Sequence, residues 1–252
     1  MTEPAPAAPS APEPGVEAPR WGLGDALLAF MAGMVGTVVM TGVYLVASGE
    51  SNPSDNDTGL IAATLLGLWA GMFGVAWRAS RRKGSGSLGR DYGMRIVWRD
   101  VPVGIVVGLA SQFLLVSGII WLFGLIDNGV EVESQAKQIT GGARGLQLLL
   151  LAPLLCVGAP FFEELYFRGL LLRSAVRRLG AVGGIFLASL AFGLVHYTGE
   201  LNTLSLVALI TALGSFGAVL NVLAHRFGRL GPALVAHATF NAVTVIALAA
   251  AN

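Results

Sequence analysis

The sequence predicts an all-α protein, a polytopic membrane helical bundle with about seven transmembrane helices. Two observations lead to this prediction. Of the 252 residues, 54% are hydrophobic and only 12% are charged, whereas about 25% of the residues of a soluble domain are charged. The apolar residues also gather in uninterrupted runs of roughly 20 residues, which is the length that crosses a bilayer as a helix.

The chain divides into two parts of different composition. Residues 1–22 are rich in Pro, Ala and Glu. Because they offer little apolar surface to bury, we expect a disordered tail, and the tail lacks the apolar core of a signal peptide. Residues 23–252 are expected to form the transmembrane domain, and no separate soluble domain is predicted.

Seven apolar segments follow one another in the transmembrane domain, each bounded by charged or turn-forming residues. They cover approximately residues 27–47, 59–77, 101–126, 145–172, 181–197, 204–224 and 232–250. Segments this apolar need a lipid environment, so we expect an integral membrane protein. We expect it to reside in the plasma membrane.

Basic residues are concentrated in alternate links between these segments. The link after the second segment carries Arg78, Arg81, Arg82, Lys83, Arg90, Arg95 and Arg99, and later links carry Arg173, Arg177, Arg178, Arg226 and Arg229. The positive-inside rule places all of them in the cytoplasm, together with the N-terminus. The first of these links can also be interpreted as a binding site for anionic lipid, although a topology signal is the simpler interpretation. The net charge of +1 indicates no attraction to nucleic acid.

Two glutamates and an arginine lie in the otherwise apolar fourth segment, namely Glu163, Glu164 and Arg168. A charge at the centre of a bilayer costs roughly 2.5–3.5 kcal/mol, so such residues pair, line a cavity or do chemistry. Glu164 and Arg168 are four residues apart on one helix face, which predicts an ion pair. Glu163 lies about 100° around the helix, and it is expected to face a cavity and act as a general base.

Two prolines interrupt the same segment, Pro153 and Pro160. Pro160 has no amide hydrogen, and in an α-helix this leaves the carbonyl of Cys156 unpaired. Freed backbone groups are tolerated beside protein or water rather than lipid, which predicts a kink and a wet cavity near Glu163. A kink that serves packing alone explains the prolines equally well. Cys156 is the only cysteine, which excludes a disulfide within the chain and a cysteine cluster for zinc.

Two of the three histidines fall inside predicted segments. Phe192 and His196 are four residues apart, as are His237 and Asn241, so each pair shares a helix face. His225 falls in a basic link and is expected to be solvated. A single intramembrane histidine is more often an interhelical hydrogen-bonding group than a catalyst, but two of them beside a glutamate pair and an asparagine favour a catalytic site.

The chain contains three motifs in order. They are EExxxR at Glu163–Arg168, FxxxH at Phe192–His196 and HxxxN at His237–Asn241. In this order on successive membrane segments, they resemble the CPBP family, which comprises type II CAAX prenyl endopeptidases and bacteriocin-processing or self-immunity (Abi-like) proteins. The resemblance covers about residues 148–247, within a motif-bearing core at 145–250. The first three segments carry no motif of this kind.

The resemblance implies an intramembrane endopeptidase that hydrolyses a peptide bond of a membrane-associated peptide or protein. By matching motif positions, Glu163 and His196 would activate the attacking water, and His237 and Asn241 would stabilise the oxyanion. The remaining motif residues, Glu164, Arg168 and Phe192, would support the site. A non-catalytic immunity or scaffold protein of the same family is the alternative, and a proton-coupled transporter is a weaker one.

The resemblance leaves the metal open, because family members are often described as metalloproteases while a metal-free glutamate mechanism is also proposed for them. His196, His237 and Glu163 could hold zinc with an open fourth position. Glu163 and His196 could also deprotonate water directly. The HExxH zinc motif is absent.

The depths of the candidate residues raise one difficulty. Glu163 and His237 fall toward the cytoplasmic part of their segments, whereas His196 falls late in its segment, toward the outer side. A joint site therefore requires either that the fifth helix begins deeper or that the fourth breaks at Pro160 and re-enters.

Overall fold

The computed structural model describes residues 19–49, 57–130, 143, 145–197, 199 and 201–251. Within these ranges every regular element is helical, so the predicted all-α bundle is confirmed. Residues 1–18, most of the expected tail, lie outside the described residues. Residues 19–22 are described, and the side chain of Trp21 is buried, so the packed part of the chain begins before the first helix.

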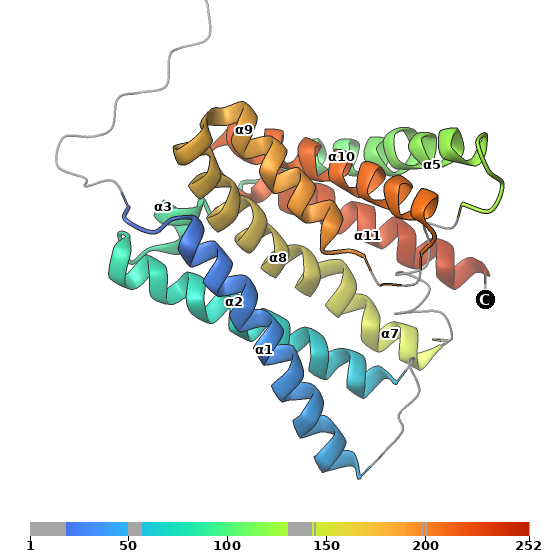
Figure 1. The fold of residues 1–252 in the computed structure, drawn as a ribbon, viewed down its shortest axis with the longest axis horizontal. Coiled ribbons are helices and arrows are strands. Elements are labelled where there is room, and N and C mark those ends of the chain that lie inside the picture. Colours follow the sequence, from blue (N-terminus) through green and yellow to red (C-terminus); the bar gives the residue numbers. More distant parts are fainter. Residues whose placement is uncertain are drawn as a thin grey trace, which may run out of the picture.

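The helices follow the order of the apolar segments (Figure 1). In the list below, η denotes a π-helical stretch. The elements are α1 (Leu23–Ser48), α2 (Thr58–Lys83), α3 (Leu88–Tyr92), α4 (Asp100–Ala110), η1 (Ser111–Val116), α5 (Ser117–Gly124), α7 (Leu146–Pro153), η2 (Leu154–Gly158), α8 (Ala159–Glu164), η3 (Leu165–Leu172), α9 (Arg173–Leu194), α10 (Thr203–Phe227) and α11 (Gly231–Ala251).

Six helices of the described chain are long and apolar enough to cross a membrane. One of them, Leu146–Leu194, has 49 residues and reverses direction at Gly180, where φ is 74° and ψ is 174°. This backbone conformation favours glycine, which has no Cβ to clash. Divided at Gly180, the six helices correspond to the seven segments that the sequence predicts.

The motif-bearing helices occupy the middle of the molecule (Figure 1). α1 and α2 pack together on one side, α10, α11 and α5 lie on the other, and the continuous run from α7 to η3 passes between them. All eight residues of η3 are buried. The stretch that directly follows the two glutamates is therefore buried between helices on both sides.

Two helix ends differ from the sequence-based expectation. α2 continues to Lys83 rather than ending near residue 77, and the fourth segment continues beyond residue 172 to the turn at Gly180. The apolar pattern marks where side chains leave hydrocarbon, but backbone hydrogen bonding continues past that point. In α2 the last turn carries Arg81, Arg82 and Lys83, and positive charges there interact favourably with the helix dipole.

Basic links that are distant in sequence meet at one end of the bundle. The backbone N–H of Leu230 donates to the Gly93 carbonyl, and the N–H of Gly231 donates to the Arg95 carbonyl. Arg229 and Asp100 form an ion pair of 2.6 Å, and hydrogen bonding to this carboxylate raises the pKa of Arg229. We call this region the basic end: the residues at the start of α1, the link 84–99, the turn at Gly180 and the link 228–230.

Close backbone contact joins α1 to α2. A Cβ built on Gly36 would lie 2.1 Å from the Gly67 carbonyl oxygen, and one built on Gly67 would lie 2.2 Å from the Gly36 carbonyl oxygen. Small residues allow this approach, which is a common way for membrane helices to associate. Beyond it, the Tyr44 hydroxyl donates to Asp57, the N-cap of α2, and this hydrogen bond lowers the pKa of Asp57.

We expect Gly36→Ala to destabilise the protein by roughly 1–3 kcal/mol, because the added methyl group forces two helix backbones apart. Gly42 provides a matched control on the same helix, since a Cβ there meets no atom within 4 Å. Gly42→Ala should be neutral or mildly stabilising. Thermal unfolding in detergent compares the two variants, and equal melting temperatures would contradict the close packing.

The orientation of the bundle stays a prediction from the basic links, and it can be tested at Ser85, an exposed residue of the basic end. In a Cys156→Ser background, Ser85→Cys should be labelled by a membrane-impermeant maleimide only after the cells are opened. Labelling of intact cells would place the basic end outside.

Candidate active site

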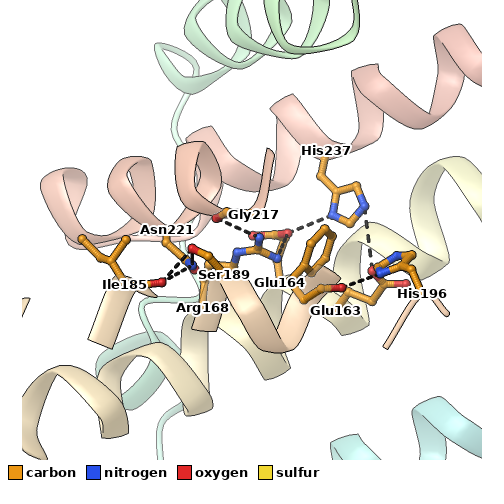
Figure 2. A network of polar contacts seen from close by, with 10 residues as sticks. Glu163, Glu164, Arg168, Ile185, Ser189, His196, Gly217, Asn221 and His237 are labelled. Atoms are coloured by element: carbon orange, nitrogen blue, oxygen red, sulfur yellow. Dashed lines mark hydrogen bonds and ion pairs between the residues drawn. The ribbon is translucent and has the colours of Figure 1, made fainter. Parts of the chain in front are cut away.

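The centre of the candidate site is the carboxylate of Glu164, which is fully buried. Arg168 Nη1 donates to Glu164 Oε1 over 2.9 Å, and both side chains have 0% exposure. His237 Nδ1 lies 2.8 Å from the same oxygen. Figure 2 shows this arrangement, with α8 and η3 supplying the glutamate and arginine and α11 supplying the histidine. The predicted ion pair is confirmed, whereas the contact with His237 was not predicted.

Arg168 is held on several sides, which a buried guanidinium requires. Its Nη2 donates to the Gly217 carbonyl of α10 over 3.2 Å. The Phe192 ring centroid lies 4.4 Å from its central carbon, a distance at which the ring face attracts a cation. Arg168 therefore joins three elements, η3, α9 and α10, around the Glu164 carboxylate.

Glu163 and Glu164 differ sharply in access. The Glu163 side chain retains 22% exposure, and Glu164 retains none. The Glu163 Oε2 atom lies 3.8 Å from His237 Nε2, and it has no hydrogen-bond partner among the described residues. Oε2 of Glu164 also has no described partner, but its Oε1 is bound by Arg168 and His237. The two carboxylates therefore differ in exposure, and Glu163 is the accessible one.

The hydrogen bond to Glu164 fixes the orientation of the His237 ring. Because Arg168 pairs with Glu164 as a carboxylate, that oxygen can only accept a hydrogen bond. Nδ1 of His237 must then carry the proton, and Nε2 faces Glu163. Each ring nitrogen of His237 thus faces one of the two glutamates.

His196 stands just past the end of α9. The backbone N–H of His196 bonds to the Gly193 carbonyl, so the Phe192 carbonyl is left to the His196 side chain, whose Nδ1 lies 2.6 Å away. The last carbonyls of a helix lack intrahelical partners and are commonly capped by such side chains. With the proton on Nδ1, Nε2 is the free acceptor.

The structure also removes the difficulty over depth. The fourth segment neither breaks at Pro160 nor re-enters, and the fifth does not start deeper, so both expected alternatives were wrong. Instead the fourth segment extends to Gly180, so that Glu163 lies 17 residues before this turn and His196 lies 16 residues after it. At about 1.5 Å per residue, the two residues reach the same level of the bundle.

Asn241 is anchored on a backbone group that the proline exposes. Its Nδ2 donates to the Leu155 carbonyl over 2.8 Å. In η2 the N–H of Ala159 bonds to the Leu154 carbonyl five residues back, and in that register the partner of Leu155 is Pro160, which has no N–H. The carbonyl that Asn241 uses is therefore that of Leu155, one residue before the Cys156 carbonyl that α-helical counting predicts to be freed.

Phe192 separates and supports the charged groups. Its ring lies 4.7 Å from the His196 ring and 5.8 Å from the His237 ring, measured between centroids. Phe216 of α10 packs edge-on against His237 at 5.7 Å. Neither Phe216 nor Gly217 carries a motif, so sequence reasoning missed both. Their only signal is a place in an apolar segment, which many other residues share.

Zinc binding by His196, His237 and Glu163 stays a prediction. Among the described residues, no three His, Cys, Asp or Glu side chains lie close enough together to hold a metal ion. Nδ1 of each histidine is engaged, by the Phe192 carbonyl for His196 and by Glu164 for His237, which leaves Nε2 of both rings as the nitrogen that could bind a metal.

The fold and the site together define a class, a membrane helical bundle with a buried, hydrogen-bonded glutamate, histidine and arginine cluster. Residues 145–243 match the family described as Type II CAAX prenyl endopeptidase Rce1-like. This part of the chain carries all three motifs, so the resemblance to the family is confirmed for these residues. The matched family implies, in general terms, a CAAX-type endopeptidase of the membrane. Neither the curated proteins nor the solved structures gave a match.

The different surroundings of the two glutamates predict different consequences of mutation. Glu164→Ala leaves Arg168 charged, buried and unpaired, which typically costs about 3–5 kcal/mol. Glu163→Gln removes a charge that has partial exposure and no partner closer than the 3.8 Å contact to His237, so it should change stability little. Thermal unfolding of both purified variants tests this difference, and equal melting temperatures would show that Glu164 is not the structural member of the pair.

Proposed function

We propose that the protein hydrolyses a peptide bond of a membrane-associated substrate, with Glu163 as the general base. The observation that supports this role is the partial exposure of Glu163 beside a fully buried Glu164. A base must reach the proton that it abstracts within hydrogen-bond distance, and Glu163 has a buried oxygen without a described partner for such a contact.

In the proposed reaction, a water molecule lies between Glu163 and His196. Glu163 takes its proton while the water oxygen attacks the carbonyl carbon of the scissile bond. His196, held through Nδ1 by the Phe192 carbonyl, presents Nε2 as a second acceptor that orients the water. When the tetrahedral intermediate collapses, the carbon–nitrogen bond breaks, and the proton passes from Glu163 to the leaving amine.

His237 and Asn241 are the proposed donors to the oxyanion. Asn241 has two amide hydrogens, and only one is needed for the Leu155 carbonyl, so the other remains available. His237 donates through Nδ1 to Glu164, so donation through Nε2 requires a doubly protonated ring. In such a ring Glu164 accepts the Nδ1 proton, and the Glu163 carboxylate, 3.8 Å from Nε2, supplies a nearby negative charge without a hydrogen bond.

Glu164, Arg168 and Phe192 are proposed as positioning residues. None needs to touch the substrate. Glu164 sets the orientation of His237, Arg168 holds Glu164 as a carboxylate, and the Phe192 ring packs against both histidines. We also propose, from the name of the family, that substrates carry a CAAX-type terminus.

The proposal predicts a graded loss of activity. Glu163→Gln should abolish turnover almost completely, because an amide cannot accept the proton. Asn241→Ala should remain active but be slower by roughly 100- to 1000-fold, the usual effect of losing one oxyanion donor. Substrates are first identified as membrane peptides that accumulate uncut in cells whose only copy of the protein carries Glu163→Gln. Cleavage of these peptides is then measured for each variant.

Two controls separate this activity from the alternatives. Wild-type and Glu163→Gln proteins must be present in the membrane in equal amounts, which excludes a folding defect. If Glu163→Gln preserved the cellular function and no peptide accumulated, the non-catalytic immunity or scaffold reading would replace the protease. Cleavage by wild-type protein after dialysis against a chelator decides separately between a metal-dependent and a metal-free reaction.

A further inference from the structure

A concave site lies at the basic end of the bundle. It is a pocket of about 360 Å³ formed where the start of the packed chain, α3, the η3–α9 junction and the end of α10 come together. The charged and titratable residues that line it are Arg90, Asp91, Arg168, Arg173, Arg177 and His225.

The pocket carries an excess of positive charge. Arg90, Arg173 and Arg177 form no ion pair with a carboxylate of the described chain. The one acidic residue of the lining, Asp91, is engaged elsewhere, because it accepts hydrogen bonds from the Ser80 hydroxyl and the Ser85 backbone N–H. The lining therefore holds three arginines without an ion-pair partner among the described residues, against one carboxylate, that of Asp91.

Two of these arginines, Arg173 and Arg177, are held in place by neutral groups. Arg173 Nη2 donates to the Gly228 carbonyl over 2.8 Å. Arg177 donates to the Trp21 carbonyl, and its central carbon lies 3.9 Å from the centroid of the Trp21 ring. A guanidinium has five N–H donors, so each contact fixes the side chain and leaves other donors for a ligand.

Arg168 forms the inner wall of the pocket. It is completely buried and paired with Glu164. The arginines that a ligand in the pocket can reach are therefore Arg90, Arg173 and Arg177, which retain exposed surface.

We propose that this pocket binds the phosphate-bearing headgroup of an anionic lipid. Guanidinium groups match phosphate oxygens in geometry and charge. The pocket opens at the helix ends, where headgroups lie, and Leu172, Val176 and Ala224 add apolar surface to its lining. A lipid with a charged headgroup and apolar acyl chains would contact both the arginines and this apolar surface. The site uses residues from four parts of the chain and does not depend on the proposed proteolysis.

The test measures thermal stability of the full-length protein in a zwitterionic detergent during titration with dioctanoyl phosphatidate. We expect a saturable rise in melting temperature, because a ligand that binds the folded state stabilises it. Dioctanoyl phosphatidylcholine, which has no net charge, should produce no saturable rise. Inorganic phosphate is the third compound to be titrated. If it bound as tightly as phosphatidate, the ligand would be free phosphate rather than a lipid headgroup, and the proposal would be overturned.

Variants then locate the binding. Arg90→Gln and Arg177→Gln should each weaken phosphatidate binding roughly fivefold, the effect of one basic residue near an anionic surface. Arg177→Lys keeps the charge and should retain most of the affinity even if the contact with Trp21 is altered. The matched control is Arg78→Gln with Arg82→Gln, exposed arginines in the last turns of α2 and outside the pocket, which should leave the affinity unchanged.

Two results would overturn the proposal. The first is equal weakening by the pocket variants and by the Arg78 and Arg82 control, which would mean that only the overall charge matters. The second concerns Glu17, which lies two residues before the pocket residue Pro19. If phosphatidate bound only to Glu17→Gln protein, the natural occupant would be the chain's own carboxylate.

Discussion

The structure depends on keeping one buried carboxylate charged. Glu164 and Arg168 have no contact with solvent, and a buried charge that loses its partner costs several kcal/mol. The pair is completed by the Gly217 carbonyl from α10, His237 from α11 and the Phe192 ring from α9. Four parts of the chain must hold their relative positions to satisfy it. The contacts that satisfy this buried charge therefore also fix the relative orientation of the side chains in the candidate site.

Local features of the site could be predicted from the sequence because they depend on spacing along one helix. The separation of four residues between Glu164 and Arg168 determines their shared face in any helix, and the ion pair follows. The bond between Glu164 and His237 could not be predicted in this way, since it depends on how α8 and α11 are placed across the bundle. Composition gave the seven segments, but it could not give the end of a helix whose backbone continues beyond the apolar run, as it does after Leu172.

The π-helical stretches explain why counting along the chain failed at Pro160. π-Turns are uncommon and occur frequently at functional sites, and here η2 and η3 lie on either side of α8, which carries both glutamates. A π-turn adds one residue to the hydrogen-bonded ring, so the group left without a donor moves from the Cys156 carbonyl to the Leu155 carbonyl. Asn241 uses that group. Nothing in the local composition distinguishes the two registers, because both bury the same apolar residues.

The shortness of α9 after the turn at Gly180 has a consequence for the surrounding bilayer. From residue 181 to Leu194 the helix rises about 21 Å at 1.5 Å per residue, whereas the hydrocarbon layer is about 30 Å thick. Such hydrophobic mismatch is accommodated by local thinning of the membrane. Thinning beside α9 would lower the headgroups of one leaflet toward His196. A peptide chain could then reach the level of the histidine from the lipid–water boundary without crossing the full apolar layer.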